Sequence, residues 1–112
     1  MARAHASAAN LEESAPVFAA LGDRTRLRIV SRLSESTGLS TAKLTSGTRV
    51  SRQAVAKHLN TLAEAGLVRS RRSGRERLWE LQAARLARAG RELESISKQW
   101  DAALERLRRM VE

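Results

Sequence analysis

The chain has 112 residues, a hydrophobic content of 42% and a net charge of +9, which indicate one globular domain with a polyanionic partner such as nucleic acid or an anionic membrane surface. It contains no cysteine, which excludes disulfides and thiolate metal sites and fits a cytoplasmic protein. No apolar run approaches the roughly 20 residues of a membrane span, which excludes a spanning helix.

The positive charge is concentrated in one part of the chain. Residues 49–77 contain eight arginine or lysine residues and two glutamates, so a net charge of +6 out of +9 lies in about a quarter of the sequence. Solubility alone does not need such a concentration. The distribution therefore favours a binding surface for a polyanion within residues 49–77.

Residues 1–13 are expected to form a flexible N-terminal tail, and residues 14–82 to form the folded domain. A first helix is predicted over residues 14–21, because Pro16 then falls in its first turn. A start at Asn10 is an alternative, since Asn10 and Glu13 have the spacing of a capping box. That start would place Pro16 in a helix interior at a cost of about 3 kcal/mol.

A second helix is predicted over residues 24–34, capped by Asp23. Its buried side is expected to consist of four aliphatic residues: Leu27, Ile29, Val30 and Leu33. The four arginines around this face, residues 24, 26, 28 and 32, are interpreted as solvated charges with local salt bridges.

Two further helices, residues 40–46 and 51–65, are joined by a tight turn at Gly47-Thr48. Leu44 of the first is expected to point inward, and Val55, Leu59 and Leu62 of the second form one apolar stripe. On the second helix Ser51 is the predicted cap, and Arg52, Gln53, Ala56 and Lys57 point away from the stripe. Two helices in this layout, with an exposed polar second helix, are typical of a helix-turn-helix.

Residues 67–81 are predicted to form a hairpin with its turn at Ser73-Gly74. Alternation places Trp79 and Leu81 on one face, toward the core. Five arginines lie within nine residues of this hairpin, at positions 69, 71, 72, 75 and 77. Such a density suits contacts with phosphates or insertion into a minor groove.

One long helix is predicted for the remainder, from about residue 84 to residue 111. Leu86, Leu93, Trp100 and Leu107 recur every seven residues, and intermediate positions hold Ala89, Ile96, Ala103 and Met110. This is a coiled-coil seam. A helix of roughly 42 Å cannot bury the whole seam on so small a domain, so a second copy of the chain is the simplest partner. Residues 83–112 are therefore expected to be a dimerisation helix. Gly90 is kept either for close approach at that contact or through drift.

Residues 18–30, with the sequence FAALGDRTRLRIV, resemble the start of the ArsR-type winged-helix repressors. So does SRQAVAKHL at residues 51–59, with Leu62, residues 65–68 and Gly74-Arg75 after it. The resemblance covers roughly residues 15–82. It implies a winged helix-turn-helix fold, mostly α with a small β-hairpin, and a homodimer built from the first and last helices. It also implies repression through an inverted repeat in a promoter.

The chain departs from relatives that sense metals. Residues 40–44 have no cysteine pair, and the last helix has no histidine. The only histidines are His5, in the tail, and His58, for which a packing role or a phosphate contact is expected. The resemblance is therefore to the metal-free branch, with no metal or cofactor. Arg24 stands where relatives usually have proline.

Site residues follow from these interpretations. Arg52 and Gln53 are expected to read base edges, and Thr48, Ser51 and Lys57 to hold phosphates. The wing arginines expected at the DNA backbone or minor groove are Arg71, Arg72, Arg75 and Arg77. The residues expected at the dimer interface are Phe18, Leu86, Leu93, Ile96, Trp100 and Leu107.

The leading hypothesis is thus a cytoplasmic, nucleoid-associated, homodimeric regulator that binds double-stranded DNA and not a membrane. The alternative is a protein-interaction adaptor or antitoxin-like dimer that uses the last helix; such an adaptor would expose the seam until its partner arrives. An enzyme is excluded in practice, because no nucleophile–base pair or glycine-rich phosphate loop is present. The sequence does not identify a small-molecule effector.

Overall fold

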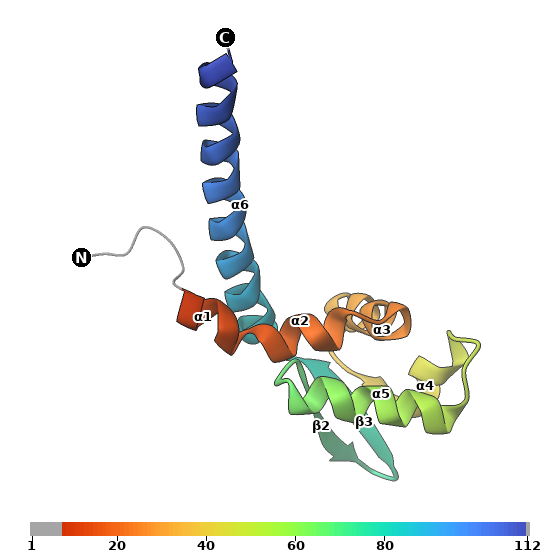
Figure 1. Cartoon of the computed structure of the whole chain (residues 1–112). Coiled ribbons are helices and arrows are strands. Elements are labelled where there is room, and N and C mark those ends of the chain that lie inside the picture. Colours follow the sequence, from red (N-terminus) through yellow and green to blue (C-terminus); the bar gives the residue numbers. More distant parts are fainter. Residues whose placement is uncertain (1–7, 112) are drawn as a thin grey trace.

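The computed structural model describes residues 8–111, and their side chains from residue 11 onward. The described chain forms helices and strands in this order: α1 (Ala8–Glu13), α2 (Ala15–Leu21), α3 (Arg24–Ser34), β1 (Leu39–Ser40), α4 (Thr41–Ser46), α5 (Arg52–Glu64), β2 (Val68–Ser73), β3 (Glu76–Leu81) and α6 (Ala83–Val111). Helices α1 to α5 and the strands gather at one end of α6, whose distal part extends away as an arm (Figure 1). The predicted fold, a mostly helical winged helix-turn-helix with a long last helix, is confirmed.

The core lies where α2, α3 and α5 meet the inner end of the sheet. Aliphatic side chains fill it: Val17, Ile29, Val30, Leu33, Leu44, Val55, Leu59, Leu62, Leu67 and Val68, together with Trp79 from β3. The three residues predicted as the stripe of α5 are completely buried. Burial of this stripe fixes the rotation of α5 about its axis, so the opposite face of the helix must point outward.

Helix α3, which corresponds to the second predicted helix, differs from its prediction at one position. Leu27 is 51% exposed, whereas Ile29, Val30 and Leu33 are buried as expected. On a helix with 3.6 residues per turn, Leu27 lies at the edge of the face that these three residues define, and Arg26 lies nearer its centre. The prediction that Leu27 is buried was therefore wrong.

The strands form one antiparallel sheet in the order β1-β3-β2. The predicted hairpin is confirmed, with Val68 opposite Leu81, Ser70 opposite Trp79 and Arg72 opposite Arg77. Strand β1, which the sequence analysis did not predict, adds two residues on the other side of β3, with Leu39 opposite Trp79. This short strand connects the start of α4 to the wing, so the helix-turn-helix and the hairpin are parts of one rigid unit.

The N-terminal prediction needs a correction. Residues 8–13, which were assigned to the flexible tail, form helix α1, whereas residues 1–7 lie outside the described residues. The helical structure is interrupted at Ser14, between α1 and α2. Pro16 therefore falls in the first turn of α2, as predicted. The predicted start at residue 14 agrees with α2 to within one residue, whereas the alternative start at Asn10 was wrong, because Asn10 lies inside α1.

A polar cluster fastens α6 to the α1–α2 junction. The hydroxyl of Ser14, which is completely buried, donates to Oε1 of Glu92. Arg88 contacts Oε2 of Glu92 at 3.3 Å and Oε1 of Glu13 at 2.7 Å. Arg85 donates to the Glu13 carbonyl at 3.0 Å. These bonds lower the pKa of Glu92 below its usual value, with the Ser14 hydroxyl as the main cause.

Candidate nucleic-acid interface

The N-terminal turn of α5 is exposed and correctly capped. The Ser51 side chain accepts a hydrogen bond from the Ala54 amide at 3.0 Å, as predicted for an N-cap. Arg52, Gln53 and Lys57 are exposed on the face opposite the buried stripe. The Ser51 hydroxyl hydrogen and the first amides of α5 remain available to an anion, which is favoured at a helix N-terminus.

The turn before α5 is held together internally. The Thr48 hydroxyl lies 3.0 Å from the Thr45 carbonyl and 3.3 Å from the Val50 carbonyl, and it accepts from the Val50 amide at 3.3 Å. These contacts identify Thr48 as a residue that shapes the turn, in addition to the phosphate contact predicted for it.

Arg32 fixes the other side of this turn. Its guanidinium donates to the Leu44 carbonyl at 2.9 Å and to the Lys43 carbonyl at 3.1 Å. A Cβ added at Gly47 would lie only 2.4 Å from Nη1 of Arg32, so a larger residue there would displace the Arg32 guanidinium from its position beside these carbonyls.

Arg26 connects α3 to the recognition helix α5. Its Nε donates to the Ala20 carbonyl at 2.6 Å, and its Nη1 lies 3.1 Å from Nδ1 of His58. Nε2 of His58 lies 3.9 Å from the Asp23 carboxylate. The pKa of Asp23 is lowered, mainly because its carboxylate accepts the Arg26 amide hydrogen, with a further contribution from the positive charges nearby. His58 thus has polar contacts within its own domain, and the phosphate contact expected for it stays a prediction.

The arginines of α3 were predicted to be solvated charges with local salt bridges, and for Arg26 and Arg32 this was wrong. Both bind backbone carbonyls of other elements, because each lies beside a helix end whose carbonyls lack partners within the helix. Only the tertiary structure brings these helix ends close, so no local sequence signal identified the contacts.

The wing arginines divide between the two faces of the hairpin. Arg72 and Arg77 are cross-strand partners on the face that also carries Trp79, and the Arg77 guanidinium lies 5.9 Å from the centre of the Trp79 ring. Arg71 lies on the opposite face and pairs with Glu80 at 2.8 Å. Arg75 follows Gly74, whose φ of +63° forms the tight turn at the tip.

A tryptophan sets the angle of the wing. Nε1 of Trp79 donates to the Thr41 hydroxyl at 2.9 Å, and the Trp79 side chain is 4% exposed. This bond joins β3 to the first residue of α4. The backbone of the wing is thereby connected directly to the helix-turn-helix.

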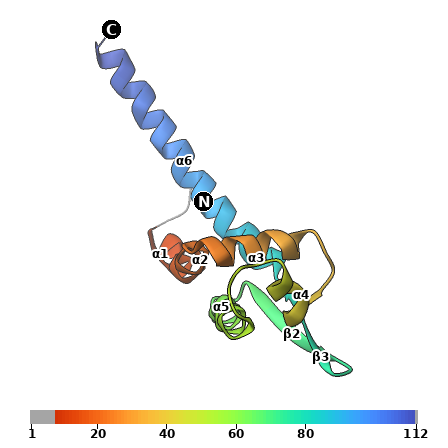
Figure 2. The ribbon, with the colours of Figure 1, turned by 90° about the vertical axis from the view of Figure 1, so that its right-hand side faces the viewer.

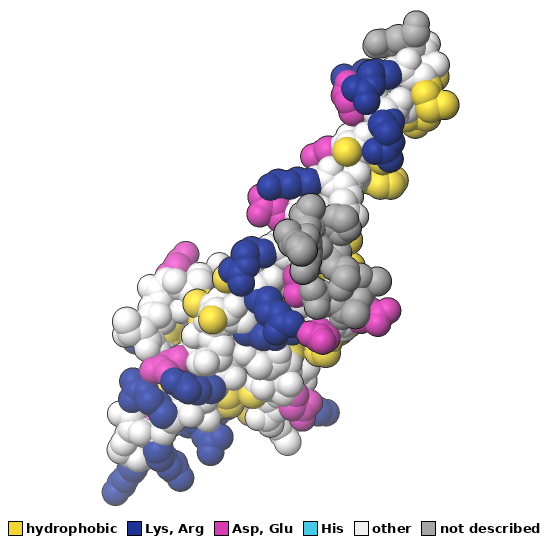
Figure 3. Space-filling model, turned by 90° about the vertical axis from the view of Figure 1, so that its left-hand side faces the viewer, with side chains coloured by type: hydrophobic (Ala, Val, Ile, Leu, Met, Phe, Trp, Pro, Cys, Tyr) yellow, Lys and Arg dark blue, Asp and Glu magenta, His cyan; other side chains and the backbone are white. Residues whose placement is uncertain are grey.

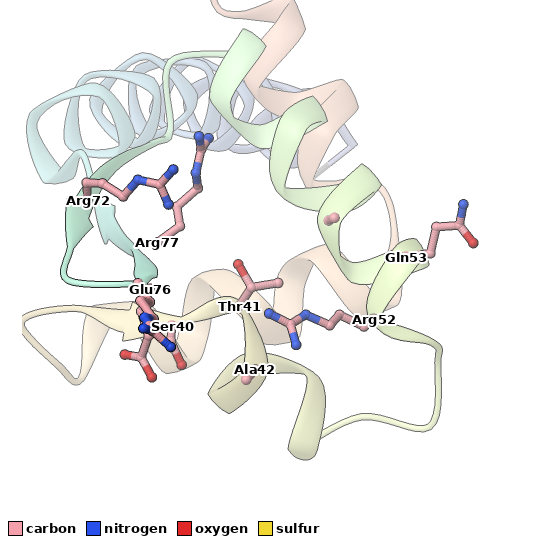
Figure 4. A pocket seen from close by; sticks show the side chains of 10 residues that line it. Ser40, Thr41, Ala42, Arg52, Gln53, Arg72, Glu76 and Arg77 are labelled. Carbon is pink, nitrogen blue, oxygen red and sulfur yellow. The ribbon is translucent and has the colours of Figure 1, made fainter.

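These elements enclose a basic hollow of about 720 Å³ between α4, α5 and the wing. It is lined by Ser40, Thr41, Ala42, Arg52, Gln53, Ala56, Arg72, Arg75, Glu76 and Arg77. Arg52 points across the hollow toward Thr41, Arg72 and Arg77 lie on its wing side, and Gln53 points away from it (Figure 4). Lysine and arginine side chains also cluster at the wing end of the surface (Figure 3).

The structure thus brings together most of the predicted DNA residues on one side of the molecule. Arg52, Arg72, Arg75 and Arg77 line one hollow, and Gln53 lies at its edge with its side chain pointing away. Ser51 and Lys57 line a shallower one along α5, together with Asn60, which the sequence analysis missed. It also missed Ser40 and Thr41, because polar residues at the start of a short helix have no distinguishing pattern.

The predicted dimer residues fall into two groups. Phe18 and Leu86 pack against the core and Ile96 is half-buried, whereas Leu93, Trp100 and Leu107 are 54%, 65% and 57% exposed. One intermediate seam position differs from the prediction, because Ala89 is buried within its own domain, whereas Met110 is 81% exposed. Leu104 and Val111 take part in the exposed stripe instead, at 46% and 79% exposure.

Within the described residues, no group of three or more histidine, cysteine, aspartate or glutamate side chains could hold a metal ion. None of the helices in that part of the chain is long and apolar enough to cross a membrane.

Comparison with known proteins identifies similar chains. Residues 21–71 match a family of helix-turn-helix domains. The solved structure of an ArsR-like transcriptional regulator from Rhodococcus sp. RHA1 is 42% identical, covers 90% of this chain and 94% of that chain, and superimposes with a TM-score of 0.76. An uncharacterised HTH-type transcriptional regulator of Bacillus subtilis is 44% identical over 68 residues, which are 55% of this chain and 74% of the relative. One from Methanocaldococcus jannaschii is 35% identical over 56% of this chain and 71% of its own length.

Proposed function

The chain belongs to the ArsR-like family of winged helix-turn-helix transcriptional regulators, which bind DNA, and from this membership we propose that it is a homodimeric, sequence-specific repressor of a promoter. The observation that supports this function best is the basic hollow between α5 and the wing. A hollow bounded by a capped helix N-terminus and two cross-strand arginines suits a phosphate backbone beside a major groove.

The roles of the α5 side chains follow from their directions. Arg52 and Gln53 project from the first turn, where a recognition helix meets base edges, and each can form paired hydrogen bonds with a purine. The Ser51 hydroxyl and Lys57 lie to either side of them and bind phosphates. Thr48 contributes chiefly by shaping the turn.

In the wing, Arg72, Arg75 and Arg77 face the hollow and contact the flanking backbone or minor groove. Arg71 must first leave its ion pair with Glu80, so its contribution to DNA binding is smaller. In a dimer, two recognition helices about 34 Å apart would meet successive major grooves, which requires an inverted repeat. A dimer seated on such a site excludes other proteins from the promoter, which is the mechanism of the proposed repression.

Fluorescence anisotropy with the DNA upstream of this protein's own gene tests the proposal. Sequence-specific binding predicts that the complex survives an excess of random duplex and loses affinity steeply as salt rises. Equal affinity for both duplexes at all salt concentrations would contradict specific recognition of this site.

A protein-interaction module remains the second candidate, because the exposed stripe on α6 is available to another protein. The two functions differ in the state of the isolated chain. A self-pairing stripe gives a stable homodimer, whereas an adaptor stays monomeric until its partner is added. Sedimentation of the purified protein separates these outcomes.

A further inference from the structure

The outward surface of α5 has a small apolar side chain among long polar ones. Ala56 is half-buried and lines both the basic hollow and the shallower hollow along α5. Its neighbours on the helix surface, three or four residues away in the sequence, are Arg52, Gln53 and Asn60, all of which are exposed. Because alanine has the shortest side chain of the four, the surface dips at Ala56 and presents a methyl group there.

This methyl group lies on the side of α5 that faces the wing. Figure 2 looks almost along α5 and shows α4 and the wing together on one side of it. Ala56 belongs to that side, since it lines the basic hollow with Thr41 of α4 and Arg77 of the wing. Ala54, two residues earlier, lines the shallower hollow and not the basic one. A duplex in contact with both α5 and the wing is therefore closer to Ala56 than to Ala54.

The fold itself does not require alanine at position 56. Ala56 belongs neither to the buried core nor to the partly buried residues that pack against it, whereas Ala63 and Ala65 pack against the core. Helix propensity does not require it either, since arginine, lysine and glutamine are nearly as good helix formers as alanine. A role in contact with a ligand is thus the more specific explanation for a methyl group at the centre of a polar surface.

The chemistry of the major groove indicates which base suits this methyl group. All four bases present hydrogen-bond donors or acceptors in the groove, but only thymine adds an apolar group, its C5 methyl. A protein methyl group that covers a donor or acceptor leaves it without a partner, which is unfavourable. Ala56 therefore matches thymine and does not match guanine, adenine or cytosine.

We propose that Ala56 is a specificity-determining residue that recognises thymine by contact between the two methyl groups. The inference rests on the proposed function and adds the identity of one base in each half-site. Arg52 precedes Ala56 by about one helical turn, which is about 6 Å along the axis, and a base-pair step is about 3.4 Å. The thymine should thus lie within about two base pairs of the position whose recognition depends on Arg52.

Replacement of thymine by uracil tests the inference, because it removes the C5 methyl and keeps the hydrogen-bonding groups of the base. The probe is a duplex that carries the inverted repeat enriched from random DNA by the full-length protein. Each thymine of one half-site is replaced in turn, and fluorescence anisotropy gives the affinities of the wild type, Ala56→Gly and Ala54→Gly. Ala54→Gly is the matched control, since it removes the same methyl group from the same helix.

The wild type should bind about fourfold more weakly when one particular thymine is replaced, a factor that corresponds to one buried methyl group. Ala56→Gly should bind the thymine and uracil duplexes equally. Glycine weakens the helix by the same amount for both duplexes, so this effect cancels from the ratio of their affinities. Ala54→Gly should keep the fourfold ratio.

A repeat without thymine near the position that depends on Arg52 would overturn the inference, and so would a wild type that is insensitive to every uracil. Sequence-specific binding, and with it the proposed function, would stand in both cases. A fourfold ratio that persists in Ala56→Gly, or is lost in Ala54→Gly, would assign the methyl contact to another residue and also overturn the inference. If no repeat is enriched at all, the proposed function fails together with the inference.

Discussion

The residues at the first turn of α5 have different proposed roles in DNA binding. Ser51 caps the N-terminus of α5 with its side-chain oxygen. Its neighbours Arg52 and Gln53 project outward because Val55 and Leu59 are completely buried. The wing arginines lie on a different element, and the role proposed for them is contact with the flanking backbone or minor groove. Specificity and affinity should therefore depend on different residues.

Substituting Arg52 by alanine should cost about 1–3 kcal/mol of binding to the cognate site and relax its specificity, because paired hydrogen bonds to a base are lost. Substituting Arg75 should weaken cognate and random DNA alike and reduce the slope of log affinity against log salt by about 1. Anisotropy titrations on both duplexes across a salt series measure the two effects. If both variants changed both duplexes equally, the assignment of roles would be wrong.

Substitution of Arg26 should change the stability of the fold. A change to lysine keeps the charge but loses the fork that joins the Ala20 carbonyl to Nδ1 of His58. The free energy of unfolding should fall by about 1–2 kcal/mol. Thermal unfolding measures this loss. Arg28→Lys is the control, since Arg28 is exposed and has no ion pair among residues 11–111, and an equal loss in both variants would refute the role of Arg26.

At the scale of the elements, α6 is both a part of the domain and an arm beyond it. Its base is held by Ser14, Arg88 and Glu92, whereas its distal half has exposed apolar side chains. The angle at which the arm leaves the domain therefore depends on a polar cluster. This cluster contains an ionisable group with a lowered pKa.

The sign of the pH dependence follows from that shift. The folded pKa of Glu92 lies below its ordinary value of 4.5, so the charged form stabilises the fold above about pH 4.5. This contribution is lost as the pH falls from 4.5 through the lowered pKa. The chain should thus lose stability in acid, and Glu92→Gln should be less stable at neutral pH and less sensitive between pH 5 and pH 3.

Thermal unfolding of the wild type and Glu92→Gln across this pH range makes the comparison. Glu94→Gln is the matched control, because Glu94 is exposed and forms no ion pair within the described part of the chain. Parallel pH curves for the wild type and Glu92→Gln would contradict the role assigned to the carboxylate.

The sequence predicted those elements whose signals are local. Caps at Asp23 and Ser51, the glycine turn of the hairpin and the periodicity of α5 all gave correct bounds within one or two residues. The errors arose where tertiary contacts decide. Nothing local indicates that Arg32 reaches the Leu44 carbonyl, or that Ala89 is covered by its own domain.

The same limit applies to the candidate site. Arg52 and the wing arginines were identified from a charge cluster within a known layout. The contribution of α4 to the hollow was missed, because it depends on the bond between Trp79 and Thr41 and on strand β1. A two-residue strand is too short to leave a periodic signal.

At the scale of the whole molecule, DNA affinity should depend on pairing of the arms. In the proposed dimer, one helix-turn-helix would meet half of an inverted repeat, and linkage through α6 would make the second contact intramolecular. A charge within the stripe should separate the copies, because it would be buried without a partner.

Leu107→Glu should therefore give a monomer by sedimentation, and affinity for a full inverted repeat should fall on the order of 10²-fold. The fold of the domain should not change, since Leu107 is 57% exposed in the protomer. Gln99→Glu introduces the same charge change off the stripe and should remain dimeric. A dimeric Leu107→Glu chain would show that the stripe is not the contact.

The most direct test of the central claim is selection of binding sites by the full-length protein from a random DNA library, because it needs no assumption about the target promoter. The proposed function predicts enrichment of an inverted repeat whose half-sites are about one helical turn apart. Selection with the Arg52→Ala variant should lose preference at one position in each half-site. A library that remains random after repeated rounds, although the protein binds it, would contradict sequence-specific recognition by α5.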